Sequence, residues 1–375
     1  MNKLLRLSGL MWGVVSTVGC GVSEESVQEP GAPSSLATST RAVTASQWSL
    51  SASMGVSRTM NTVALLDSGL VLVSGGYHIS SRGVTTVLSN ATLYNPYSDT
   101  WQSTGFLNTP RYYAASVRLA SGKVLVSGGQ GPTWGAAALN TTELYDPNTG
   151  TWSVASPMSQ PRYRHKTTLL GSGKVLVTGG YHSYSQHATT AELYDPATNT
   201  WSPAGDLGHD TYLSVPVRLY SGEVLLVNAG TQQVDLYNPD TNSWRQVASS
   251  PASHAPISEY DTFTATRLYS GSVLVVGGGS AELYDPYNDQ WSSAPPTDQP
   301  FRGHAAALLY SGQLLIAGGD SFQIYNPWSN AWGPVGSVPG TPVLCSSVLL
   351  DSGQVLLSGG GNGLWPTSFS PIFTP

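Results

Sequence analysis

Arginine and aromatic residues recur together at three places in the first half of the chain. Arg58, Arg111 and Arg162 each stand ten residues before a serine that opens a Ser-Gly pair, and Tyr113 and Arg164 follow the second and third of them. A guanidinium beside aromatic rings suits sugars, carboxylates or peptides, because it donates paired hydrogen bonds and stacks on ring faces. The alternative is structural: a repeated arginine can tie neighbouring repeats together by hydrogen bonding to loop carbonyls. The sequence leaves both interpretations open.

Histidines and further aromatic residues fall in the same part of the repeat or in the loops after it. His165 lies seven residues before Ser172, and His304 lies seven residues before Ser311. The candidate ligand-binding residues are Arg58, Arg111, Tyr113, Arg162, Arg164, His165, Tyr181, His182, Arg302 and His304, with Trp134, Tyr184, His187, Asp210, Glu259 and Asp261 in adjoining loops.

Sequence patterns of several enzyme classes are missing. The chain has no glycine-rich phosphate loop, no His-Glu-x-x-His and no Gly-x-Ser-x-Gly, and no motif pairs a serine or histidine with an orienting carboxylate. A formal net charge of −6, with 10% charged residues, argues against nucleic-acid binding. We therefore predict no catalytic residue and no cofactor. A glycan-modifying enzyme stays open, because only the fold can bring an Asp/Glu pair together.

The elements that position these residues come from one repeated unit. Each copy carries a Leu-x-Ser-Gly turn, an apolar run and a glycine pair or its remnant, and six copies continue with Tyr-Asp/Asn-Pro and a tryptophan seven residues after the tyrosine. The turn serines are Ser68, Ser121, Ser172, Ser221, Ser270, Ser311 and Ser352, and the tyrosine–tryptophan pairs are Tyr94/Trp101, Tyr145/Trp152, Tyr194/Trp201, Tyr237/Trp244, Tyr284/Trp291 and Tyr325/Trp332.

Each unit is predicted to form a sheet of four strands. The first strand ends at the Ser-Gly turn, where glycine allows a positive φ, and the Val/Leu run forms the second. The segment before the tyrosine forms the third strand, and the tryptophan opens the fourth. Four-stranded sheets repeated about every 40–50 residues are typical of a β-propeller. The fold class is therefore all-β, a seven-bladed propeller over residues 46–375.

The two ends of the chain are predicted to share the last blade. The seventh copy has no tryptophan after its apolar run, but Trp48 lies twenty residues before Ser68, the spacing found between a tryptophan and the next turn serine in blades 1 to 4. We expect residues 46–54 to supply the fourth strand of blade 7 and residues 368–371 to supply its third. Such a closure leaves the ring without an open edge.

Alternating strand direction sorts the connections onto two faces. Connections between blades, and those between the second and third strands, share one face, here named the loop face. The Ser-Gly and Asp/Asn-Pro turns share the other, here named the turn face. From the glycine pair to the motif tyrosine the gap is 18, 16 and 14 residues in blades 1–3 but 6 in blades 5 and 6. Since long loops on a rigid scaffold tend to carry binding sites, we expect the ligand site on the loop face and little on the turn face.

The N-terminal segment has the pattern of a targeting sequence. Residues 1–20 combine Lys3 and Arg6 with an apolar stretch too short to span a bilayer, which predicts a signal peptide. Residues 21–45 are rich in Ser, Thr, Pro and Gly and are predicted to be a flexible tether. Beyond this segment Cys345 is the one cysteine, so we predict no intramolecular disulfide and expect Cys345 to pack as a small apolar residue.

Residues 17–20, Thr-Val-Gly-Cys, resemble the lipobox of bacterial lipoproteins. The resemblance implies lipidation of Cys20 and a place in the bacterial cell envelope, at the outer membrane. An ordinary secretory signal, and so a secreted protein, is the alternative.

The repeat itself resembles the bacterial kelch repeat, and residues 46–375 are similar to the central domain of galactose oxidase. Residues 111–113, Arg-Tyr-Tyr, resemble the Arg-x-Tyr that carries the cross-linked tyrosine of that family, and residues 162–165 resemble its Arg-x-Tyr-His. The resemblance implies copper, held by Tyr113 and His165, as an alternative. This sequence departs from the family pattern because Arg164 replaces the second tyrosine and Met60 stands at the place of the cross-linking cysteine.

Three functions are consistent with these observations. The first is a monomeric, lipid-anchored binding module of the cell envelope that recognises a glycan, an envelope polymer or a protein through the loop face. The second is a galactose-oxidase-like copper oxidase or another carbohydrate-active enzyme. The third is a structural envelope protein that assembles with its own copies. The arginine, tyrosine and histidine residues on the long-loop side favour the first, and so favour binding over catalysis.

Overall fold

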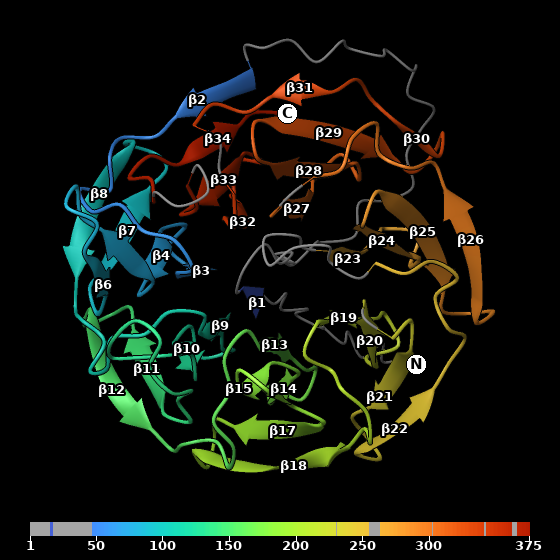
Figure 1. Ribbon diagram of the computed structural model, residues 1–375, viewed down its shortest axis with the longest axis horizontal. Coiled ribbons are helices and arrows are strands. Elements are labelled where there is room, and N and C mark those ends of the chain that lie inside the picture. The colour runs from blue at the N-terminus through green and yellow to red at the C-terminus, as the bar shows by residue number, and fades with distance from the viewer. Residues whose placement is uncertain are drawn as a thin grey trace, which may run out of the picture.

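The protein is a ring of seven antiparallel sheets (Figure 1). The computed structural model describes residues 16–17, 47–229, 231–254, 263–301, 303–340, 343–361 and 366–375. The predicted signal peptide and tether, with Cys20, lie outside the described residues, apart from β1 (Ser16–Thr17), which pairs with β9. In the part of the chain that the structure describes, no helix is long and apolar enough to cross a membrane.

Blades 1 to 3 each have four strands, and two of them carry an additional hairpin. Blade 1 consists of β3 (Thr62–Leu65), β4 (Val71–Ser74), β7 (Ala91–Asn95) and β8 (Thr100–Thr104), with the hairpin β5 (Tyr77–Ile79) and β6 (Thr85–Val87). Blade 2 consists of β9 (Ala115–Arg118), β10 (Val124–Ser127), β11 (Thr142–Asp146) and β12 (Thr151–Ala155). Blade 3 consists of β13 (Lys166–Leu169), β14 (Val175–Thr178), β17 (Thr190–Asp195) and β18 (Thr200–Asp206), with the hairpin β15 (Tyr181–Ser183) and β16 (Gln186–His187).

Blades 4 to 7 repeat the same order, and in blades 4 to 6 the connection between the second and third strands is shorter. Blade 4 consists of β19 (Ser214–Arg218), β20 (Val224–Asn228), β21 (Val234–Asn238) and β22 (Ser243–Gln246), and blade 5 of β23 (Thr264–Arg267), β24 (Val273–Gly277), β25 (Ser280–Asp285) and β26 (Gln290–Ala294). Blade 6 consists of β27 (Ala305–Leu308), β28 (Leu314–Gly318), β29 (Ser321–Asn326) and β30 (Ala331–Trp332), and β31 (Gly336–Ser337) also pairs with β29. Blade 7 consists of β32 (Ser346–Leu349), β33 (Val355–Ser358), β34 (Pro371–Phe373) and β2 (Trp48–Leu50). The predicted seven blades of four strands are confirmed.

The hydrophobic core consists of layers between the blades rather than of one central cluster. The Val/Leu strands are buried along their whole length, because each blade packs both faces on its neighbours. Seven apolar clusters fill the seven interfaces between neighbouring blades, including the one between blades 7 and 1.

The glycine pair lets neighbouring blades approach closely. Gly129 (φ 93°) donates its backbone N–H to the carbonyl of Arg162 in the next blade, at 2.8 Å. A Cβ atom on Gly128 would lie 2.3 Å from the same carbonyl oxygen. Any side chain at this position would therefore separate blades 2 and 3.

The tyrosine–tryptophan motif joins the outer strands. In the six complete repeats the two rings lie 4.8–5.1 Å apart, on directly opposed residues of the third and fourth strands. The indole N–H of Trp152 donates to the carbonyl of Gly105 in the preceding blade, and Trp201, Trp244, Trp291 and Trp332 make equivalent bonds. The tryptophan therefore links each of blades 2 to 6 to the blade before it.

The N-terminal strand closes the ring, as the spacing of Trp48 predicted. Strand β2 pairs with β34, and Trp48 lies opposite Phe373. The third strand of blade 7 begins later than expected, at Pro371 instead of residue 368. The register follows the aromatic pair: Phe373 occupies the place of the motif tyrosine, with its ring 5.1 Å from that of Trp48.

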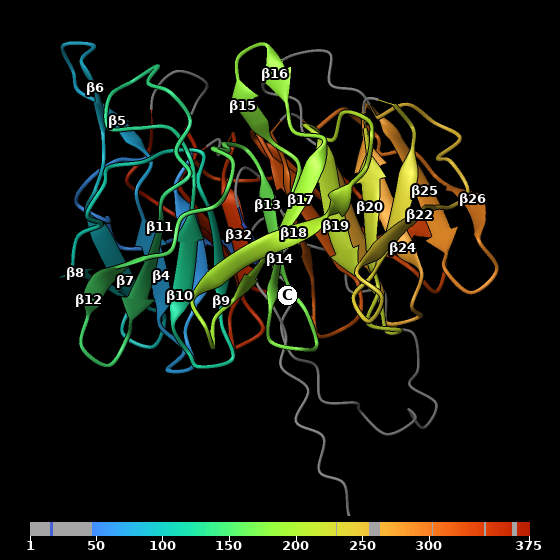
Figure 2. The ribbon, with the colours of Figure 1, turned by 90° about the horizontal axis from the view of Figure 1, so that it is seen from below.

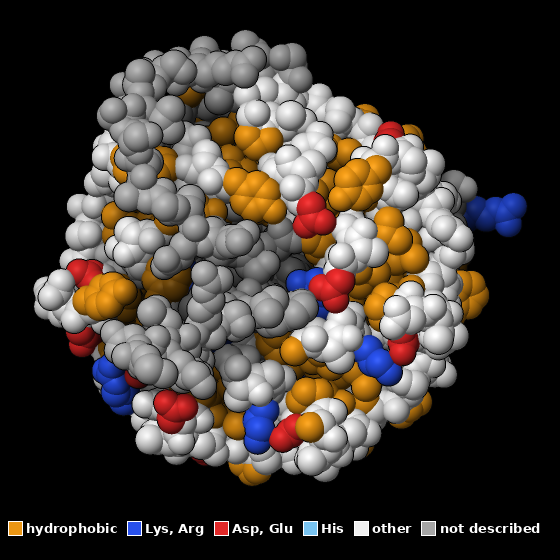
Figure 3. Space-filling model, turned by 180° about the vertical axis from the view of Figure 1, so that it is seen from behind, with side chains coloured by type: hydrophobic (Ala, Val, Ile, Leu, Met, Phe, Trp, Pro, Cys, Tyr) orange, Lys and Arg blue, Asp and Glu red, His pale blue; other side chains and the backbone are white. Residues whose placement is uncertain are grey.

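The two faces of the ring differ as the loop lengths predicted. Hairpins β5–β6 and β15–β16 rise above the loop face (Figure 2). The turn face offers more than expected, because the Asp/Asn-Pro turns expose Tyr97, Tyr287 and Trp328, and hydrophobic side chains lie at intervals around that face (Figure 3). Several of these rings cover a turn glycine: a Cβ atom on Gly271 would lie 3.3 Å from the Tyr287 ring, and one on Gly312 would lie 2.9 Å from the Trp328 ring. They are therefore spread from blade to blade rather than gathered in one site.

Candidate functional site

The three repeated arginines lie in the interior of blades 1–3. Arg58 and Arg162 are 0% exposed and Arg111 is 1% exposed. Nη1 of Arg111 donates to the carbonyls of Gly128 (2.7 Å) and Thr141 (3.0 Å), and Nη2 forms an ion pair with Glu143 at 2.7 Å. This geometry favours the structural alternative over ligand contact.

Each of these arginine side chains bonds to groups within its own blade. The structural alternative drawn from the sequence was that a repeated arginine ties neighbouring repeats together. Arg162 donates to the carbonyls of Gly179 and Thr190 and pairs with Glu192 at 3.2 Å, all in blade 3. Burial lowers the pKa of both Arg111 and Arg162, and the neighbouring carboxylates oppose that shift. It is the backbone carbonyl of the arginine, bonded to a glycine of the preceding blade, that joins neighbours.

Residues with a left-handed backbone recur at one register of the repeat, just before the first strand of five of the blades. Tyr113 and Arg164 have φ of 54° and 57°, which non-glycine residues rarely adopt. Tyr113 donates its N–H to the carbonyl of Met60, and Arg164 donates to that of Tyr113, so the register forms a hydrogen-bonded chain between blades 1, 2 and 3. We name these the collar residues: Met60, Tyr113, Arg164, Gly303 and Leu344.

The side chain of the residue that follows a collar residue points into the space between two blades. His165 is fully buried and its Nε2 lies 2.8 Å from the hydroxyl of Ser127 in blade 2. His304 is 1% exposed, and its Nε2 lies 3.2 Å from the hydroxyl of Thr264 in blade 5. Cys345 is buried in the cluster between blades 6 and 7, as a small apolar residue would be. The structure therefore does not bring the two histidines together.

The buried His165 is expected to make stability fall in acid. Burial, and secondarily Arg162, lowers the pKa of His165 from 6.5 to about 3. As the pH falls, the unfolded chain binds a proton at this histidine before the folded protein does. The contribution of neutral His165 to the free energy of unfolding is therefore present above pH 6.5 and is lost as the pH falls toward 3, at about 1.4 kcal/mol per pH unit. Urea unfolding between pH 7 and pH 4.5 measures this loss. His165→Asn, which keeps a polar group near Ser127, should flatten the slope, and an unchanged slope would contradict the assignment.

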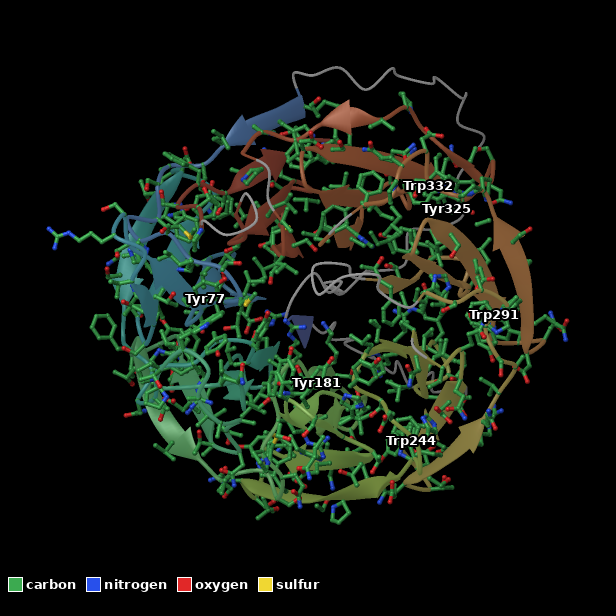
Figure 4. All side chains as sticks on the ribbon, in the orientation of Figure 1. Tyr77, Tyr181, Trp244, Trp291, Tyr325 and Trp332 are labelled. Atoms are coloured by element: carbon green, nitrogen blue, oxygen red, sulfur yellow. The ribbon has the colours of Figure 1, made fainter. Side chains whose placement is uncertain are left out.

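A continuous series of rings, here named the aromatic wall, runs along the loop face from blade 1 to the entry of blade 4. Trp134 stacks on Tyr112 at 5.0 Å and contacts Tyr77 edge-on at 4.6 Å. Tyr163 stacks on Tyr181 at 5.2 Å. The members are Tyr77, Tyr112, Tyr113, Trp134, Tyr163, Tyr181, His187 and Tyr212, each within 6.3 Å of a neighbouring ring. Tyr77 and Tyr181 lie closer to the ring axis than the motif residues Trp244 and Trp291, which lie on the outer strands (Figure 4).

Arg164 places a positive charge at the centre of this wall. Its guanidinium carbon lies 4.1 Å from the centroid of the Tyr113 ring, and Nη2 donates to the Tyr113 hydroxyl. The phenols of Tyr113, Tyr181 and Tyr163 favour the cation and raise the pKa of Arg164 against the opposing effect of burial. Burial in turn raises the pKa of Tyr181 to about 12, so the wall combines neutral phenols with one fixed cation.

The accessible rings of the site are one member of the wall and one tyrosine on the hairpin that carries Tyr181 and His187. Trp134 is 51% exposed and Tyr184, on the turn of the β15–β16 hairpin, is 96% exposed, whereas Tyr112 and Tyr163 are buried. Tyr181 is half-buried beside His187, which pairs with Asp210 at 2.9 Å. His182 is a structural anchor, because its Nδ1 donates to the carbonyl of Pro161 at 2.7 Å.

Tyr212 is a member of the wall that sequence reasoning missed. Its ring stacks on His187 at 4.0 Å. It stands nine residues before Ser221, the position that Tyr112 and Tyr163 hold in their own repeats, so the spacing contained a signal for it. Arg302, Glu259 and Asp261, which the sequence placed on the opposite side of the mouth, lie outside the described residues.

The residues present do not fit the copper site that the resemblance implies. The guanidinium of Arg164 donates to the Tyr113 hydroxyl. A positively charged group therefore occupies the place beside Tyr113 where a copper ion would need a further ligand. The Nε2 atom of His165 is directed to Ser127 between the blades. Among the residues that the structure describes, no group of three or more His, Cys, Asp and Glu side chains could hold a metal ion.

Known proteins share the repeat and the fold. The family described as the Kelch motif matches residues 111–159 and 162–208, in blades 2 and 3. The chain is 26% identical to a putative F-box/kelch-repeat protein of Arabidopsis thaliana, over 64% of this chain and 54% of that one. It is 22% identical to Kelch-like protein 36 of Rattus norvegicus, over 70% of this chain and 44% of that one. The chain thus spans about half the length of the curated relatives it matches.

A solved structure supports the same conclusion about the fold. A fungal alcohol oxidase of the AA5 family, solved in complex with copper, superposes with a TM-score of 0.66 at 18% identity, over 88% of this chain and 76% of that one. Identity at this level shows a shared fold and leaves function to be argued from the site. The sheet topology and these similarities together identify the chain as a seven-bladed β-propeller that carries kelch motifs in blades 2 and 3.

Proposed function

We propose that this protein is a binding module of the bacterial cell envelope that recognises a glycan, an envelope polymer or a protein ligand through the aromatic wall. Kelch propellers typically mediate protein interactions, which supports binding as the general role. The single observation that carries the proposal is the continuous wall with Arg164 among its rings, together with the exposed rings of Trp134 and of Tyr184 on the β15–β16 hairpin. The lipid anchor at Cys20 and the envelope location rest on the sequence pattern alone.

The chemistry of the wall suits ligands with both flat apolar and polar faces. Exposed Trp and Tyr rings stack on sugar rings, prolines or aromatic side chains, and a guanidinium among phenols donates hydrogen bonds to hydroxyl or carboxylate groups. Because Tyr112 holds Trp134 by stacking and Tyr163 holds Tyr181 in the same way, two members of the wall are supported before a ligand arrives. Such preorganisation lowers the entropy lost on binding.

Binding to glycans, cell-wall fragments and envelope proteins immobilised on an array tests the proposal. For a ligand found there, replacing both Trp134 and Tyr184 with alanine should weaken binding at least about tenfold, because two exposed aromatic contacts contribute roughly 1 kcal/mol each. The matched control is Tyr97→Ala with Tyr287→Ala, which removes two exposed rings from the turn face. Loss of binding in the control alone would place the site on the turn face and overturn the proposal.

A further inference from the structure

The buried arginines of blades 2 and 3 each have a carboxylate partner in a fixed place. Glu143 accepts from Arg111 at 2.7 Å and from the backbone N–H groups of Asn108 (2.6 Å) and Thr109 (3.1 Å). In blade 3, Glu192 accepts from Arg162 and from the backbone N–H of Ser159 at 2.7 Å. Both glutamates stand on the third strand, opposite the third residue of the Val/Leu strand. A negative charge at this register therefore neutralises the arginine.

Blade 1 has the arginine without the carboxylate. Thr92 stands at the register of the two glutamates, opposite Val73. Arg58 is 0% exposed, and its Nη1 donates to the carbonyls of Gly75 (3.1 Å) and Asn90 (3.2 Å). Among the described residues, Nε and Nη2 of Arg58 have no hydrogen-bond partner, and neither does the Thr92 hydroxyl. Blade 1 thus has three buried donor groups without a partner, on the arginine and on the residue that stands at the register of the glutamates.

The charge of Arg58 persists despite its burial. Desolvation lowers its pKa to about 10, which leaves the guanidinium protonated at neutral pH, and no described acidic group contributes to that pKa. A buried cation without a counter-charge is strongly unfavourable. The Oδ1 atom of Asn90 is also without a partner and could accept one hydrogen bond, but an amide carries no charge to balance the guanidinium.

We propose that blade 1 binds a small monovalent anion, chloride or a short carboxylate, between the Arg58 guanidinium and the Thr92 hydroxyl. The anion takes the place that the Glu143 and Glu192 carboxylates fill in the next two blades. A threonine side chain has two heavy atoms fewer than a glutamate, and the missing atoms belong to the part of the side chain that carries the charge. Arginine and hydroxyl donors at a dry site are the groups that hold such anions.

The site lies beside the closure of the ring. Arg58 follows β2, the N-terminal strand of blade 7, and its backbone N–H donates to the carbonyl of Thr367 in that blade at 3.0 Å. An anion that fixes Arg58 therefore stabilises the junction where the N-terminal and C-terminal strands meet. The expected result is a halide-dependent stability of the whole propeller.

Bromide in place of chloride locates the anion directly. Crystals of the protein grown in sodium bromide should give an anomalous difference peak within hydrogen-bond distance of Arg58 Nη2 and the Thr92 hydroxyl. Thr92→Glu, which supplies a tethered carboxylate, should remove that peak. A water molecule or the Asn90 amide in that place, with no bromide, would overturn the proposal.

Thermal unfolding gives an independent readout. In the wild-type protein, replacing gluconate by chloride at constant ionic strength should raise the midpoint by a few degrees relative to the same exchange in Thr92→Glu. The comparison is made between the two proteins, because salts also stabilise folded chains in a general way. Equal responses of the two proteins to chloride would overturn the proposal. If Thr92→Glu does not fold, Thr92→Val, which removes only the hydroxyl donor, replaces it in the comparison and should reduce the response to chloride.

Discussion

Glu143→Gln is expected to destabilise the propeller by about 3–5 kcal/mol, the range found when one partner of a buried ion pair is removed. Glu143 is nearly inaccessible and accepts from the Arg111 guanidinium and from two backbone N–H groups. The amide keeps the size of the carboxylate but carries no charge, so Arg111 becomes a buried cation without a counter-charge. Urea unfolding followed by tryptophan fluorescence measures the loss.

The matched control for this prediction lies on the surface of the same blade. Lys123 pairs with Asp146 at 3.1 Å, and both side chains are partly exposed. Lys123→Ala should leave the unfolding midpoint nearly unchanged, because exposed ion pairs contribute little. Replacing both buried partners, with Arg111→Met and Glu143→Leu, should cost less than Glu143→Gln alone. A Glu143→Gln protein as stable as the wild type would show that Arg111 does not depend on its carboxylate.

Phe373→Ala is the second change with a large expected effect, about 3–5 kcal/mol, the range for removing a buried aromatic ring. Phe373 is 0% exposed and packs on Trp48 of the N-terminal strand and on Phe322 of blade 6, with ring centroids 5.1 and 5.6 Å away. The cavity would weaken the contact that sets the register of β2 on β34. Urea unfolding and limited proteolysis near residue 48 both report on this closure.

An exposed phenylalanine of the same segment serves as the control. Phe369 is 46% exposed, so Phe369→Ala should have little effect on the unfolding midpoint. A chain beginning at residue 55, which lacks β2, should expose the edge of β34 and associate with other copies, whereas a chain beginning at residue 47 should not. If both shortened chains behave alike, the N-terminal strand is not what closes the ring.

The repeats make the loop face the variable part of an otherwise uniform scaffold. Every blade uses the same Ser-Gly turn, and all but the last use the same tyrosine–tryptophan pair, so those residues serve the ring. The wall instead draws on residues that only blades 1–3 and the entry of blade 4 supply. The binding site that we propose at this wall is therefore separate from the residues that hold the fold.

The strand order, the number of blades and the closure at Trp48 could all be predicted from the sequence, because they depend on local patterns that recur at fixed spacing. It also indicated which face carries long loops. The last strand shows the limit of this reasoning: Phe373 could not be recognised as the partner of Trp48, because a degenerate repeat gives no register until the opposing aromatic ring is in place.

Which candidate residues are buried inside a blade and which lie in the aromatic wall depends on the tertiary structure. In the sequence, Arg111 and Arg164 are both arginines next to tyrosines. In the structure, Arg111 is buried inside blade 2 and paired with Glu143, whereas Arg164 lies among the phenols of the aromatic wall. Likewise Arg164 and His165 are adjacent, and the left-handed backbone at Arg164 sends one to the wall and the other between the blades. Side-chain direction at such positions depends on contacts between blades, which residues distant in the sequence provide, and no local pattern contains them.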